Sequence, residues 1–68
     1  MQKTAFRVLA EQGLWWIRRD DEPSAEFKTK VGAVEVARRL ARYAQEDEFD
    51  VELWVHHEDG RVEGIPVG

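Results

Sequence analysis

Few side chains in this 68-residue chain could do chemistry, and their spacing argues against a catalytic site. His56 and His57 are adjacent, and neighbouring residues of a strand point to opposite faces of a sheet, so the two rings cannot bind one metal ion. Ser24 is the single serine, and the sequence places no histidine beside it to activate it as a nucleophile. The acidic run at residues 20–22 lacks the alternating oxygen ligands of a calcium loop. We therefore expect no catalytic residue, no metal, no cofactor and no small-molecule substrate.

The composition indicates one folded, water-soluble domain spanning residues 1–68. Hydrophobic residues make up 43 % of the chain and charged residues 35 %, which is too apolar for a disordered acidic tail. Cysteine is absent, which excludes disulfides and thiolate zinc sites and favours a cytoplasmic protein. Residues 1–4 lead into no hydrophobic signal segment, so we expect no membrane association. The net charge of −4 disfavours general binding to nucleic acid.

Alternating hydrophobic residues predict a β-hairpin in the first third of the chain. Residues 4–11 alternate with a period of two, which is typical of a strand with one buried face. Gln12-Gly13 interrupts the pattern, and residues 14–19 are rich in aromatic and branched side chains. Residues 20–24 carry charges and a proline and predict a solvent loop, with Phe27 anchoring its far end.

A helix is the strongest structural signal. Thr29 can cap it by accepting a hydrogen bond from a backbone N–H group two or three residues later, and the acidic tract at residues 46–48 ends it. Between them, apolar residues recur with helical spacing for about four turns. The predicted buried face consists of Ala33, Val36, Ala37, Leu40, Ala41 and Ala44. Because most of these are alanines, the helix can lie close to a sheet.

The last third predicts two more strands. Residues 50–57 alternate again, and a turn at residues 58–61 precedes a short strand at residues 62–65. A right-handed crossover from the second strand over the helix places the third strand beside the first. We therefore predict an α+β fold of the order β-β-α-β-β. Its four-stranded antiparallel sheet has the strand order 2-1-3-4, and one helix packs on one face.

Several short motifs resemble those of a bacterial family. The first hairpin carries Gly-x-Trp-x-Ile, the helix opens with Thr-Lys-x-x-Ala and continues Ala-Arg-x-Leu-Ala, and the last hairpin reads Val-His-x-x-Asp-Gly-Arg-Val. The residues concerned are Gly13, Trp15, Ile17, Thr29, Lys30, Ala33, Ala37, Arg38, Leu40, Ala41, Val55, His56, Asp59, Gly60, Arg61 and Val62. In these motifs the chain resembles the short family known as domain of unknown function 2188. The resemblance implies a strand-strand-helix-strand fold and carries no agreed activity. The acidic tract at residues 46–48 departs from the family's more compact pattern.

The sheet face opposite the helix, which we name the open face, is the candidate interaction surface. Strict alternation places Phe6, Val8, Trp15, Ile17, Leu53 and Val55 under the helix, and the open face then carries Arg7, Leu9, Trp16, Arg18, Glu52, Trp54 and His56. A small monomer seldom exposes such a contiguous patch, and tryptophan and arginine dominate interface energetics. We expect a non-catalytic module that binds another protein or, most simply, forms a homodimer by packing sheet on sheet. The alternatives are a register shifted by one residue at Trp15-Trp16, or a chain terminus folded over the patch.

Two other functions are compatible with the sequence. Trp16 and Trp54 could stack the bases of single-stranded nucleic acid while Arg7 and Arg18 meet phosphates. A basic stripe on and before the helix could instead contact nucleic acid through Lys28, Lys30, Arg38, Arg39 and Arg42, although such arginines usually form a solvated surface. Finally, acidic residues could present carboxylates that block a nucleic-acid-binding partner. These are Asp20, Asp21, Glu22, Glu46, Asp47, Glu48 and Asp50.

Overall fold

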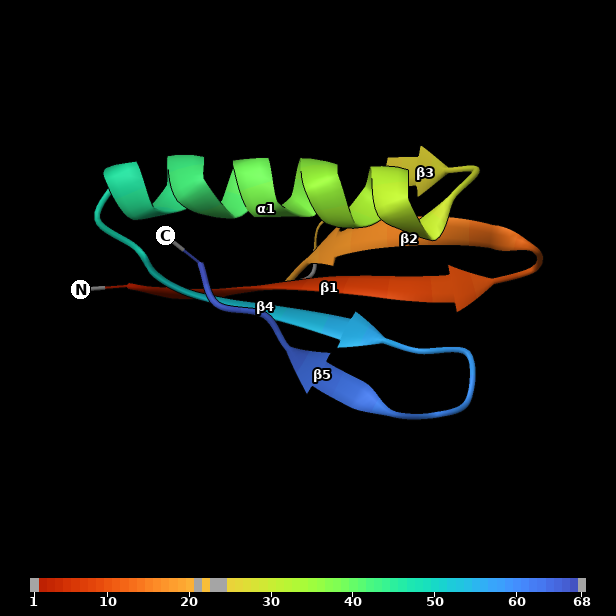
Figure 1. Cartoon of the computed structure of the whole chain (residues 1–68). Helices are drawn as coiled ribbons and strands as arrows, with labels where there is room; N and C mark the ends of the chain where they lie inside the picture. The colour runs from red at the N-terminus through yellow and green to blue at the C-terminus, as the bar shows by residue number, and fades with distance from the viewer. Residues whose placement is uncertain (1, 21, 23–24, 68) are drawn as a thin grey trace.

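The computed structural model describes residues 2–20, 22 and 25–67, which form one mixed β-sheet with a single helix lying along one face (Figure 1). In chain order the elements are β1 (Lys3–Glu11), β2 (Leu14–Arg19), β3 (Ala25–Phe27), α1 (Lys30–Glu46), β4 (Asp50–His56) and β5 (Val62–Gly64). The strand order across the sheet is β3-β2-β1-β4-β5. The α+β class and the single helix on one face are therefore confirmed.

β1 and β2 form the predicted hairpin. Its two-residue turn is made by Gln12 at φ 55° and Gly13 at φ 78°. Positive φ at both positions gives the turn the twist of the flanking strands, which explains why a glycine occupies one of them. The turn sets the register, with Val8 directly opposite Ile17.

The expected all-antiparallel sheet is wrong, because β4 runs parallel to β1, with Phe6 opposite Leu53 and Val8 opposite Val55. The cause is β3, which the sequence analysis missed. β3 pairs antiparallel to β2 and reverses the chain once more before α1 begins, so β4 points the other way. The predicted neighbours are nevertheless correct, since β4 lies beside β1 and β5 beside β4. Part of the predicted loop at residues 20–24 lies outside the described residues, while Asp20 and Glu22 are exposed.

The predicted cap of α1 is confirmed. Thr29 has an extended backbone, at φ −128° and ψ 151°, and its Oγ1 accepts a hydrogen bond of 3.1 Å from the Gly32 N–H group. At the other end, Glu48 adopts φ 67° and the Phe49 N–H group donates to the Ala44 carbonyl at 3.1 Å. This left-handed residue turns the chain out of the helix and into β4. No helix in the described part of the chain has the length and hydropathy needed to cross a membrane.

The core lies between α1 and the sheet. It consists of Ala33, Ala37, Ala41 and Ala44 from the helix, and of Phe6, Val8, Ile17, Leu53 and Val55 from the strands. The prediction that Leu40 belongs to the buried face is wrong, since Leu40 is 38 % exposed, and Val36 is only partly buried. The alanines bring the helix so close to the sheet that the buried arc is narrow. Leu40 therefore lies on the flank of α1, where it lines a pocket together with Ile17 and Ala25.

Candidate interaction surface

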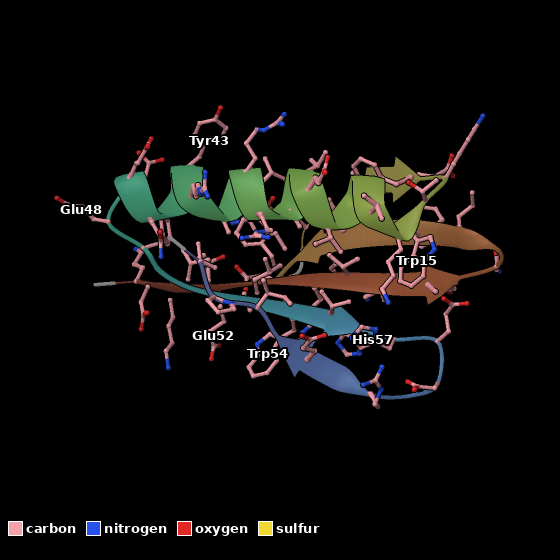
Figure 2. The ribbon with its side chains drawn as sticks, viewed as in Figure 1. Trp15, Tyr43, Glu48, Glu52, Trp54 and His57 are labelled. Atoms are coloured by element: carbon pink, nitrogen blue, oxygen red, sulfur yellow. The ribbon has the colours of Figure 1, made fainter. Side chains whose placement is uncertain are left out.

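The open face lies where alternation places it. Phe6, Val8 and Ile17 are buried under α1, so Arg7, Leu9 and Trp16 project to the opposite side of the sheet. Figure 2 shows Glu52 and Trp54 extending from β4 away from the helix, whereas Trp15 lies on the helix side. A register shift at Trp15-Trp16 is thereby excluded, because Trp15 packs against the core and Ile17 is 4 % exposed.

Register brings the open-face residues together. Arg7 lies directly opposite Arg18 on β2 and Trp54 on β4, and Leu9 lies opposite Trp16. The seven open-face residues therefore form one patch at the middle of the sheet, built from β2, β1 and β4. β1 and β4 run side by side in the same direction (Figure 1), and their register places Arg7 beside Trp54.

The two open-face tryptophans are partly buried, which corrects the expectation of bare indoles. The chain's own edge strand, rather than a terminus, covers part of Trp54. A Cβ atom added at Gly64 would lie 3.1 Å from Trp54 Cζ3, so the indole rests on the backbone of β5. Trp16 donates its indole N–H to the Glu11 carbonyl oxygen at 3.1 Å. Both rings are held in place and keep one part accessible.

β5 adds residues to this face that the sequence analysis missed. Val62 lies opposite His56 and Gly64 lies opposite Trp54, and Val62 is 50 % exposed. The signal that could have found them is the alternation of the last hairpin, because a residue paired with an open-face residue shares its face.

Two charged side chains of the open face, Arg7 and Glu52, differ in the contacts that they make within the chain. The Arg7 guanidinium donates from Nη1 to His56 Nε2 over 3.2 Å, so this histidine nitrogen is an acceptor. Glu52 is exposed two residues before Trp54 on the same face. Among the residues that the structure describes, neither Arg7 nor Glu52 forms an ion pair. The face therefore presents one cation and one carboxylate whose charges have no opposite partner within the described chain.

His57 lies on the other side of the sheet, as the alternation predicts for adjacent residues. The Lys30 ammonium group donates to His57 Nδ1 at 2.6 Å, and His57 Nε2 contacts Glu63 Oε1 at 2.8 Å. Lys30 Nζ also lies 5.6 Å from the centre of the Trp15 ring. The His57 side chain is only 13 % exposed. The cluster joins the first turn of α1 to the β4–β5 hairpin and to β2.

The residues of the candidate basic stripe lie in two different surroundings. Lys30 belongs to the His57 cluster and is not a solvated member of a stripe. Arg38, Arg39 and Arg42 are exposed on α1, and Lys28 is exposed just before it. Within the described ranges these three arginines form no ion pair.

A polar network lies at the opposite end of the sheet from the His57 cluster. Arg19 donates from Nε to Thr4 Oγ1 at 3.1 Å, and the Thr4 hydroxyl donates to Asp20 Oδ2 at 2.7 Å. Two hydrogen bonds to the Asp20 carboxylate lower its pKa below the ordinary value. The bond from the Thr4 hydroxyl has the larger effect and the bond from the Ala5 N–H group the smaller. The Arg19 guanidinium also lies over the rings of Phe6 and Phe49, at 5.2 and 5.1 Å. This arrangement ties the start of β1 to the end of β2.

Comparison with known proteins shows which family the chain resembles over most of its length. Residues 6–64 match a family model described as an uncharacterized protein conserved in bacteria, DUF2188. No curated protein and no solved structure matches the chain. The matched range begins within β1 and runs to the end of β5, so it includes the part of β1 that carries Arg7 and Leu9 and the whole of every later element. The chain belongs to the bacterial family DUF2188.

Proposed function

We propose that the protein is a non-catalytic interaction module that forms a homodimer through its open face. The observation that carries the proposal is that Trp16, Trp54 and Arg7, which lies opposite Trp54, share the side of the sheet that α1 does not cover. Tryptophan and arginine held in a defined position are the residues that contribute most to binding at protein interfaces. Val62, half exposed on the neighbouring strand, extends the apolar part of the patch.

The small core supports the same proposal. The fully buried side chains of α1 are all alanines, so the helix removes little apolar area from water. A domain of this size buries a smaller share of its surface than a larger one and gains stability from association. Packing a second open face against the first would supply a second apolar layer. The absence of cysteine supports a cytoplasmic location as part of the proposal.

Sedimentation velocity at micromolar concentration tests the dimer. We expect the wild-type chain to sediment as a dimer, and Trp54→Ala to raise the dissociation constant by about 30-fold, the size of an interface hot spot. Tyr43→Ala is the matched control, because Tyr43 is 58 % exposed on α1, away from the open face. A wild-type chain that stays monomeric throughout this range contradicts the proposal.

A second candidate is binding to single-stranded nucleic acid. Its support is the exposed group of Arg38, Arg39 and Arg42, which carry no ion pair among the described residues. The net charge of −4 counts against it. Titration of a fluorescent oligonucleotide at several salt concentrations separates the variants of this idea. Loss of binding in Trp16→Ala indicates the open face, and loss in Arg38→Ala indicates the helix.

A further inference from the structure

We propose that the two copies of the dimer are related by a two-fold axis that runs along the strands, between β1 and β4. In this arrangement Arg7 of each copy contacts Trp54 and Glu52 of the other. The inference rests on the proposed homodimer and specifies its contacts. It starts from Arg7 and Glu52, which share the open face and form no ion pair within the described part of the chain.

Because β1 and β4 pair in parallel, this axis brings Arg7 of one copy onto Trp54 of the other. A two-fold rotation about a line between two parallel strands lays β1 of one copy over β4 of the other, running in the same direction. Because Arg7 and Trp54 are opposite each other in the chain, Arg7 of one copy then lies over Trp54 of the second copy. Packed sheets lie about 10 Å apart, a distance that the long arginine side chain can bridge. Its guanidinium can rest on the indole as a cation–π pair.

The same axis brings the negative charge of Glu52 to the Arg7 guanidinium group of the other copy. It is the open-face residue next to Trp54 on β4, so Glu52 of the second copy lies within reach of the same guanidinium. The two-fold axis makes the contact reciprocal, and each dimer contains two such pairs. One copy therefore brings both halves of the pair, which favours a second copy of the chain over an unrelated partner.

The other obvious axis is unfavourable. A two-fold axis that crosses the strands at Arg7 would place Arg7 of one copy on Arg7 of the other. Like charges set against each other at an interface oppose association. The axis along the strands instead lays Arg7 over Trp54 of the second copy and Arg18 over its Gly64. It also lays β2 of one copy over β5 of the other, which brings Trp16 onto the exposed Val62 of the second copy.

Two variants with reversed charges, Arg7→Glu and Glu52→Arg, test the contact between these two residues. Arg7→Glu places two carboxylates at each pair, and Glu52→Arg places two guanidinium groups there. We expect each single variant to raise the dissociation constant of its homodimer at least tenfold over the wild type. An equimolar mixture of the two should form a heterodimer, because each of its pairs then joins a carboxylate of one copy to a guanidinium group of the other. The double variant should recover most of the wild-type affinity.

The controls are Arg42→Glu and Glu35→Arg, which make the same charge changes on the exposed side of α1. Both should leave the dissociation constant within about twofold of the wild-type value. Thermal melts followed by circular dichroism establish that each variant is folded. If a reversed charge prevents folding, Arg7→Gln and Glu52→Gln replace it, and each should weaken the dimer by about three- to tenfold.

Each failure has a separate meaning. A wild-type dimer whose single variants associate as tightly overturns the proposed contact and leaves the homodimer intact. Single variants that are monomeric and form no heterodimer when mixed also overturn it, since Arg7 and Glu52 then do not face each other. A monomeric wild-type chain overturns the homodimer and this inference together. In that case, oligonucleotide binding that Arg7→Glu abolishes would identify the occupant of the face as nucleic acid.

Discussion

Glu48 occupies a backbone conformation that suits glycine better than glutamate. Its φ of 67° follows the last turn of α1, where the Phe49 N–H group closes the helix onto the Ala44 carbonyl. An L-residue pays about 1–2 kcal/mol for the left-handed region, because its Cβ crowds the following carbonyl. The same residue is a carboxylate at the C-terminal end of the helix dipole, where negative charge is unfavourable. Residue 48 adopts this backbone conformation because the chain turns directly from α1 into β4.

Glu48→Gly is therefore expected to stabilise the protein. The free energy of unfolding should rise by about 1 kcal/mol, with the greater freedom of glycine in the unfolded chain reducing the gain. Urea denaturation followed by circular dichroism measures the change. Glu46→Gly is the control, since residue 46 is helical and glycine there should cost about 0.5–1 kcal/mol. Equal destabilisation by both substitutions would contradict this explanation.

Two carboxyl groups, those of Asp20 and Asp59, make the stability of the fold depend on pH in the acidic range. The pKa of Asp20 is lowered from 3.8 mainly by the Thr4 hydrogen bond, and the pKa of Asp59 is lowered mainly by the Arg61 N–H group. A carboxyl group whose pKa is lower in the folded state stabilises the fold above its unfolded pKa. That contribution is lost as the pH falls through the folded pKa. Stability should therefore decline as the pH is lowered below 3.8.

Asp20→Asn tests this assignment. Asparagine tolerates the φ of 49° at this position and keeps an oxygen for the Ala5 N–H group, but it does not titrate. The melting temperature of Asp20→Asn should fall less steeply than that of the wild type between about pH 5 and pH 2. Glu11→Gln, at an exposed position on β1, should leave the wild-type slope in place. An unchanged slope in Asp20→Asn would refute the assignment.

At the level of elements, the His57 cluster joins parts of the chain that are distant in sequence. Lys30 opens α1, His57 follows β4 and Glu63 lies in β5, so the contacts at 2.6 and 2.8 Å hold the hairpin to the helix. Because the Lys30 ammonium group can only donate, Nδ1 of His57 accepts from it, and Nε2 faces the Glu63 carboxylate. The β4–β5 hairpin is thereby fixed beside the open face, of which it carries Trp54 and Val62.

Lys30→Met should loosen this connection. Methionine keeps an apolar stem against Trp15 but cannot donate to His57, so we expect a loss of about 1 kcal/mol in the free energy of unfolding. Urea denaturation measures the loss, and hydrogen exchange should be faster at the His57 N–H group, which donates to the Arg61 carbonyl. Lys28→Met is the control, because Lys28 is exposed just before the helix. Equal effects of the two substitutions would contradict a specific role for Lys30.

The elements also show how far the sequence could predict the fold. The hairpin turn at Gln12-Gly13, the Thr29 cap and the alternation of β4 are local signals, and each is confirmed. β3 is only three residues long and its burial does not alternate, so its pairing with β2 depends on contacts that the local sequence does not encode. Missing that one strand reversed the expected direction of β4 while leaving the strand order correct.

At the scale of the whole molecule, the location of the candidate site was predictable and its exposure was not. Alternation is a property of single strands, and it places Arg7, Trp16 and Trp54 on one face without knowledge of strand direction. The partial burial of Trp54 depends on Gly64, which reaches it only through the pairing of β4 with β5. The charge relation between Arg7 and Glu52 likewise follows from the parallel register, which the sequence analysis did not obtain.

Both outer strands of the sheet, β3 and β5, are three residues long, and Pro66 follows β5 closely. Short edges offer few unpaired backbone groups to an incoming strand, and proline has no N–H group to donate. Lateral growth of the sheet from chain to chain, the first step toward amyloid-like fibres, is therefore poorly templated at either side. Concentrated solutions of this acidic domain should remain free of thioflavin-binding aggregates.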